Sequence, residues 1–135
     1  MSLVDLRDPG DLVAPLLVAS FDGWVDAGSA ATNAAARLAE GAETIATFDA
    51  DRLYDYRARR PTLEIVDGRL DRLTWPELTV RRARFGERDL LILSGPEPDY
   101  RWERTVEAVR EIADRLGVTL VVTTHGIPMG VPHTR

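Results

Sequence analysis

Short apolar runs that alternate with helical patterns constrain the fold of this chain more than any other feature. The first run is bounded by Pro15 on one side and by Asp22-Gly23 on the other. Apolar runs of this length, closed by turn-forming residues, are typical of strands that are buried on both faces of a sheet. The strands predicted in this way cover residues 16–21, 44–48, 89–94 and 118–124.

Helical patterns separate these strands. Residues 29–40 are rich in alanine, begin with a small polar residue and are followed by Gly41, as expected for a helix that ends at a glycine cap. Residues 102–116 repeat apolar side chains at spacings of three and four, which predicts a helix with one apolar stripe that ends at Gly117. The strand–helix–strand order predicts an α/β sandwich with a largely parallel sheet.

The middle of the chain predicts a small antiparallel extension of that sandwich. Residues 62–66 and 69–75 flank Asp67-Gly68, a dipeptide that supplies the positive φ angles of a tight hairpin turn. Residues 78–85 continue in partial alternation, and we assign them to the same extension. The chain is therefore expected to form a single α/β domain over residues 1–135.

Composition excludes several classes of function. The chain of 135 residues has a formal net charge of −5, which argues against a nucleic-acid-binding surface. It has no cysteine, so disulfides, thiolate catalysis and zinc–sulfur sites are excluded. The N-terminus lacks the basic and apolar regions of a secretory signal, and the longest apolar run is broken by Pro15. We expect a cytoplasmic protein without a membrane or nucleic-acid partner.

Three loops should meet at one edge of the predicted sheet, because the carboxyl ends of parallel strands gather there. They cover residues 22–28, 95–102 and 125–135, and each combines turn formers with aromatic or charged residues. Their side chains are predicted to recognise a partner rather than to make or break bonds. The candidate binding residues are Trp24, Asp26, Glu97, Arg101, Trp102, His125 and His133.

Some of these residues also have purely structural interpretations. Asp26 lies just before the first helix, so a bond to the N-terminal amides of that helix is favoured over a role as a site carboxylate. Trp24 is interpreted first as a packing or interface aromatic. Asp99 is predicted to be the N-cap of the second long helix, whereas Glu97 is less easily explained in structural terms.

No catalytic set is recognisable in this pattern. Ser94, His125 and a nearby aspartate are the residue types of a hydrolytic triad, but the segment 93–96 is not a nucleophile elbow. The two histidines are eight residues apart across prolines, which matches no common metal-ligand spacing. We therefore predict neither a catalytic residue, nor a metal, nor a cofactor.

Five blocks of the chain, taken together, carry a family resemblance. They occur in order at residues 21–28, 48–61, 73–76, 95–102 and 131–135. They resemble the signature blocks of the bacterial branch, typical of actinobacteria, of the proteasome assembly chaperone family, type-two subgroup. The resemblance implies a three-layer α/β/α fold similar to purine nucleoside phosphorylases and peptidyl-tRNA hydrolases, without established enzymatic activity. Archaeal and eukaryotic members help to assemble proteasome α-subunit rings, and many members self-associate.

The family domain continues well past the block at residues 131–135, where this chain stops. We therefore expect the N-terminal part of a longer domain, with an unpaired strand edge and uncovered apolar surface.

The resemblance favours a non-catalytic interaction or assembly factor, with protein partners such as proteasome α-subunits and with self-association into a homo-oligomer. One alternative is an enzyme of nucleoside phosphorylase or hydrolase type that uses Glu97, His125 and His133. Another is a small-molecule-binding module on the same loop edge that uses Trp24 and Trp102.

Overall fold

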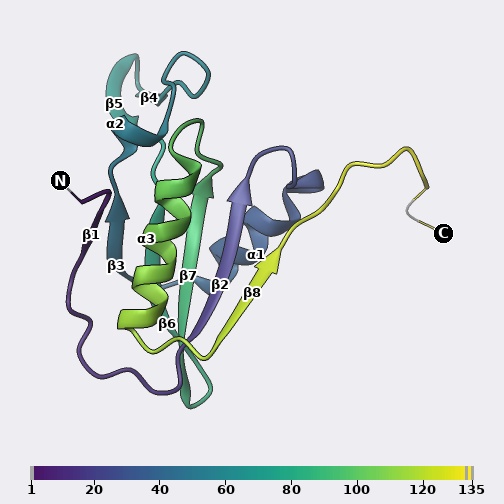
Figure 1. Ribbon diagram of the computed structural model, residues 1–135. Helices are drawn as coiled ribbons and strands as arrows, with labels where there is room; N and C mark the ends of the chain where they lie inside the picture. Colours follow the sequence, from purple (N-terminus) through teal and green to yellow (C-terminus); the bar gives the residue numbers. More distant parts are fainter. Residues whose placement is uncertain (1, 133, 135) are drawn as a thin grey trace.

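The structure is a computed structural model that describes residues 2–132 and 134. In this part of the chain a main sheet has the strand order β1-β3-β6-β7-β2-β8, and β4 and β5 form a separate hairpin (Figure 1). The strands are β1 Val4–Leu6, β2 Leu16–Asp22, β3 Glu43–Phe48, β4 Thr62–Val66, β5 Arg69–Thr74, β6 Thr79–Phe85, β7 Arg88–Pro96 and β8 Leu120–Thr124. The helices are η1 Ala27–Ser29, α1 Ala30–Leu38, α2 Ala50–Leu53 and α3 Trp102–Arg115.

The main sheet is mixed, so the prediction of a largely parallel sheet is wrong. β2 runs parallel to β7 and β8, whereas β1 with β3, β3 with β6 and β6 with β7 are antiparallel pairs. The crossover from β2 to β3 does make these two strands point the same way. What the pattern missed is that β6 belongs to the main sheet: a tight turn at Gly86, where φ is +63°, folds it directly onto β7 between β7 and β3.

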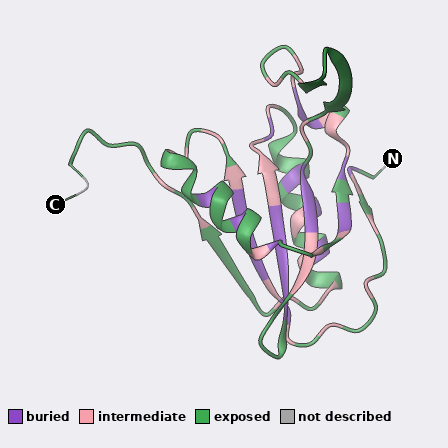
Figure 2. Cartoon of the chain, turned by 180° about the vertical axis from the view of Figure 1, so that it is seen from behind, coloured by how far each residue is buried: buried purple, intermediate pink, exposed green. Residues whose placement is uncertain are grey.

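The β4–β5 hairpin is confirmed, with positive φ angles at Asp67 and Gly68 in its turn. It projects from the body of the molecule, beyond α2 (Figure 1). All residues of both strands are exposed (Figure 2). The hairpin is therefore an arm rather than an extension of the main sheet.

The two long helices pack on opposite faces of the main sheet. Successive strand residues point to opposite faces, and accordingly Val18 lies in one apolar cluster with Ala35 of α1, whereas Leu17 lies in another with Ile112 of α3. The alanines of α1 allow it to approach the sheet closely. Within the described residues no helix is long and apolar enough to cross a membrane. The expected likeness to phosphorylases and hydrolases stays a prediction.

β8 forms an exposed edge of the main sheet, although its sequence predicted a buried strand. It pairs with β2, and no strand among residues 2–132 and 134 pairs with its other side. Leu120 and Val121 are each 53% exposed, and every residue of the strand except Thr124 is exposed (Figure 2). Apolar composition indicates what a strand can bury, but its neighbours decide what is buried. The expected unpaired edge with uncovered apolar surface is confirmed.

Candidate functional site

The loops that follow β2, β7 and β8 converge, as predicted, at one end of the main sheet (Figure 1). We call residues 22–28, 95–102 and 125–132 the loop edge. The N–H of Glu97 donates to the carbonyl oxygen of Asp22 at 2.9 Å, which joins the first two loops. The N–H of Ala27 donates to the carbonyl of Gly126 at 3.0 Å, and the N–H of Gly126 donates to the carbonyl of Val25 at 2.6 Å. These bonds fix the first loop between the other two.

Asp26 anchors the first loop to α1. Its side chain is 8% exposed and accepts hydrogen bonds from the N–H of Ala31 at 2.7 Å, the N–H of Thr32 at 3.3 Å and the hydroxyl of Thr32. The bond from the Thr32 hydroxyl does most to hold the pKa of Asp26 below its ordinary value; burial opposes it, and the N–H bonds from Thr32 and Ala31 add to the lowering. The predicted bond to the N-terminal helix amides is confirmed.

Glu97 folds over Gly23 in the first loop. A Cβ placed on Gly23 would lie 2.3 Å from Oε2 of Glu97, so the absence of a side chain at this position lets the carboxylate lie against the loop. Together with its main-chain bond to Asp22, this contact makes Glu97 part of the connection between two loops.

Large apolar side chains on the loop edge face solvent. Trp24 is 69% exposed and Met129 is 72% exposed. Trp102 is also exposed, and its ring contacts that of Phe21 edge-on with 6.2 Å between the ring centroids. Most exposed apolar residues need no explanation, but several gathered on contacting loops mark a surface suited to contact with another molecule.

Arg101 and the histidines do not all join this surface. Arg101 begins α3 with φ of +59° and lines a hollow beside Ser2 and Leu3, on the side of α3 that faces the N-terminus. His125 follows β8 directly and is exposed. His133 lies outside the described residues. The structure thus brings Trp24, Asp26, Glu97, Trp102 and His125 to one end of the sheet.

Asp99 is not the N-cap of α3, so that prediction is wrong. The cap is Arg101, which makes no side-chain capping bond. The carboxylate of Asp99 instead accepts the N–H of Asp55 at 2.9 Å and pairs with Nε of Arg59 at 3.1 Å. The N–H of Asp99 also donates to the carbonyl of Leu53. One main-chain bond and two side-chain interactions therefore direct the residue toward α2 rather than toward α3.

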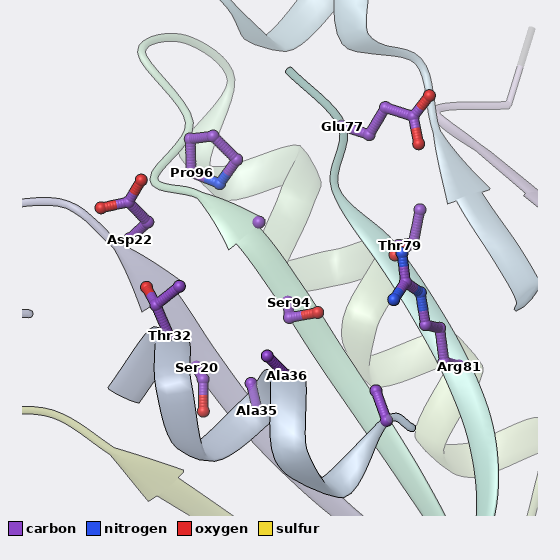
Figure 3. A pocket seen from close by; sticks show the side chains of 12 residues that line it. Ser20, Asp22, Thr32, Ala35, Ala36, Glu77, Thr79, Arg81, Ser94 and Pro96 are labelled. Carbon is purple, nitrogen blue, oxygen red and sulfur yellow. The ribbon is translucent and has the colours of Figure 1, made fainter. Parts of the chain in front are cut away.

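A cavity of about 260 Å³, lined by both apolar and polar residues, lies beside the loop edge, between α1 and strands β2, β6 and β7 (Figure 3). Ser20, Ser94 and Thr79 pair in register across the three strands and line it together. Asp22 and Glu77 line the end nearest the loops, and Arg81 lines the other part. Sequence reasoning missed this cavity. The signal in the sequence was a serine near the carboxyl end of each of two otherwise apolar strands, Ser20 in β2 and Ser94 in β7.

Comparison with known proteins identifies the family. A model described as the PAC2 family matches residues 20–135. This chain belongs to the PAC2 family. The resemblance inferred from the five sequence blocks is therefore confirmed. No curated protein matches the chain significantly.

Solved structures of actinobacterial proteins share the PAC2 fold of this chain. A Corynebacterium glutamicum protein of unknown function is 32% identical, with a TM-score of 0.87 over 98% of this chain and 53% of its own. A Mycobacterium tuberculosis proteasome-assembly chaperone homologue is 36% identical, with a TM-score of 0.81 over 89% and 52%. A PAC2 family protein from Streptomyces avermitilis is 38% identical, with a TM-score of 0.80 over 90% and 53%. This chain spans about half the length of these solved chains.

Within the described residues of this PAC2 chain, the serine and histidine expected of a catalytic dyad are not hydrogen-bonded to each other. Ser94 opens into the cavity, and among residues 2–132 and 134 no hydrogen bond joins its hydroxyl to His125. Within the same residues, no group of three or more His, Asp or Glu side chains is placed to hold a metal ion.

Proposed function

We propose that this PAC2 chain is a non-catalytic protein-interaction factor that acts in the assembly of proteasome-related complexes through its loop edge. The observation that carries the proposal is the set of exposed apolar side chains on three hydrogen-bonded loops, Trp24 and Met129 foremost. A solved relative with 36% identity is named a proteasome-assembly chaperone homologue. Membership of the same family supports extending that role to this chain.

The proposed partner is a proteasome α-subunit. Exposed tryptophans at the centre of a contact commonly supply much of its binding free energy, because the ring removes a large apolar area from water with little loss of side-chain freedom. Trp24 stands on the central loop of the three, which is tied to both neighbours by main-chain hydrogen bonds. A ring presented on such a pre-ordered loop loses little entropy when it binds.

Trp24→Ser is expected to weaken binding to the α-subunit at least about tenfold, the effect typical of an interface hot spot. Phe85→Ser is the matched control, because Phe85 is also exposed but lies at the β6–β7 turn, at the opposite end of the sheet. Surface plasmon resonance on immobilised α-subunits measures both variants. If both bind as the unmodified protein does, the loop edge is not the contact surface.

We further propose that the chain self-associates through the β4–β5 hairpin. Leu63 pairs in register with Leu73 and Ile65 pairs with Leu70, so these four side chains share one face, and each is exposed. An isolated two-stranded hairpin is marginally stable in water. The same face of a second copy of the chain could bury these apolar side chains. Two such faces would bury on the order of 800 Å² of apolar surface, at the low end for protein contacts, so the association should be weak.

Replacing the cross-strand pair by Leu63→Ser with Leu73→Ser is expected to abolish this association. The control is Thr62→Ser with Thr74→Ser, which changes the register pair on the opposite face of the hairpin. Sedimentation equilibrium over a range of protein concentrations distinguishes the two. An unmodified protein that stays monomeric throughout, or a leucine variant that associates like it, contradicts the assignment.

A further inference from the structure

Two hydroxyls of the cavity beside α1 make no hydrogen bond within the described residues. Thr79 is only 4% exposed, and its side chain makes no hydrogen bond to residues 2–132 or 134. The Ser94 hydroxyl, its register neighbour on β7, is likewise without a hydrogen-bond partner in this part of the chain. Within the described residues no side-chain oxygen is both fully buried and unpaired, so these two hydroxyls open into the cavity, where they can hydrogen-bond to a polar group that enters it.

Arg81 brings a positive charge to the same cavity. It lies two residues beyond Thr79 on β6, so both side chains are on the α1 face, and Figure 3 shows its guanidinium beside Thr79. The residue is half-buried, and the described residues supply it with no ion pair. Its neighbour in sequence, Arg82, is by contrast paired with Asp89 at 2.8 Å. A half-buried guanidinium without a counter-ion favours a carboxylate, which it binds through two parallel hydrogen bonds.

The opposite end of the cavity is negative. Asp22 and Glu77 line it there, both are exposed, and neither has an ion pair among the described residues. Asp22 is in register with Pro96 of β7, whereas Arg81 is in register with Ile92. Four residues of strand therefore separate the two levels, about 13 Å along the backbone. Even when the side chains of Asp22 and Arg81 extend toward each other, their charged groups remain too far apart to form an ion pair.

We propose that this cavity binds a small linear zwitterion of the ω-amino acid class. The carboxylate of the ligand pairs with Arg81 and accepts hydrogen bonds from the hydroxyls of Thr79 and Ser94, and its ammonium group faces Asp22 and Glu77. A volume of about 260 Å³ suits a molecule of this size. An α-amino acid fits the charge layout less well, because its two charged groups are adjacent. The site borders the loop edge and shares Asp22 with it, but the proposal does not depend on the protein contact proposed there.

A series of ligands of increasing length tests the charge layout. Isothermal titration calorimetry of the protein with β-alanine, 4-aminobutyrate and 6-aminohexanoate is expected to show binding that is best at one chain length. Butyrate and butylamine each keep one of the two charges, and each is expected to bind at least about tenfold more weakly than the best zwitterion, since a charge-assisted hydrogen bond is lost. If no member of the series binds at millimolar concentrations, the proposal is overturned.

Two variants connect the binding to the named groups. Thr79→Val keeps the shape of the side chain and removes its hydroxyl, and Arg81→Met removes the charge. Each is expected to weaken binding of the best zwitterion about tenfold, whereas Arg72→Met on the exposed β5 strand leaves it unchanged. Thermal melting of each variant, followed by circular dichroism, shows whether it is folded at the temperature of the titration. Equal binding by the folded Thr79→Val and Arg72→Met variants would falsify the assignment.

Discussion

Replacing Gly95 with alanine is expected to lower the free energy of unfolding by about 3–5 kcal/mol, through backbone strain and overpacking together. Gly95 lies in β7 with φ of +152°, a conformation that residues with a side chain rarely adopt. A Cβ at this position would lie 2.2 Å from the carbonyl oxygen of Glu77 and 2.9 Å from Cα of Leu78. Both atoms belong to the backbone, and Leu78 is fully buried, so the clash cannot be relieved by turning a side chain.

Gly86→Ala is the matched control for this substitution. Gly86 also has a positive φ, +63°, but a Cβ there would meet nothing within 4 Å. Its replacement should therefore cost only the strain of a left-handed backbone, about 1 kcal/mol. Urea unfolding followed by tryptophan fluorescence measures both variants. If Gly95→Ala lowers the free energy of unfolding no more than Gly86→Ala does, the close approach of β7 to Glu77 and Leu78 described here is wrong.

Asp89→Ala is expected to lower the free energy of unfolding by about 3 kcal/mol, because it leaves the partly buried Arg82 without its counter-ion. Asp89 is 0% exposed and accepts hydrogen bonds from the N–H of Val13 at 2.6 Å and from Nε of Arg82 at 2.8 Å. Arg84 lies 3.5 Å from its other oxygen. Arg82 in turn donates to the carbonyl of Pro9, so one carboxylate ties the loop before β2 to the β6–β7 hairpin.

The contribution of Asp89 should depend on pH in a defined direction. Burial by itself would raise the pKa of this carboxyl, but the hydrogen bonds from Arg82 and Val13 and the charges of Arg82 and Arg84 hold it below the ordinary value of 3.8. A lowered folded-state pKa gives stability that is complete above about pH 4 and is lost as the pH falls through the folded value.

Urea unfolding from pH 7 to pH 3 should therefore show the difference between the unmodified protein and Asp89→Ala narrowing in acid. Glu40→Gln, which breaks an exposed pair with Arg37, serves as a control and should change little at any pH. A gap between the unmodified protein and Asp89→Ala that is constant over this range would show that the charge of Asp89 is not the source of its effect.

Local pattern predicted most of the individual elements. The strand at β2, the helices α1 and α3 and the Asp67-Gly68 turn were all within reach, because hydrophobic period and turn chemistry are properties of short segments. The position of β6 in the main sheet could not be predicted, since its alternating pattern fits a strand of the projecting hairpin as well as a strand of the main sheet. Only its tight turn into β7 and its pairing with β3 decide between them.

The candidate site shows the same division between local and long-range information. Asp26 was correctly interpreted, because the helix amides that it binds follow within six residues. The role of Asp99 was predicted wrongly, because its partners Asp55 and Arg59 are 44 and 40 residues away in sequence. The cavity hydroxyls were missed for the same reason: Ser20 and Thr79 come together only through β7, which lies between their strands.

Native mass spectrometry of the protein, alone and mixed with the proteasome α-subunits of its own organism, is the decisive test of the proposed assembly role. We expect a defined complex of this PAC2 chain with α-subunits, and loss of that complex on Trp24→Ser. A protein that remains monomeric, or that associates only with itself in the presence of α-subunits, would contradict the assembly role and leave the cavity beside α1 as the first place to look for its function.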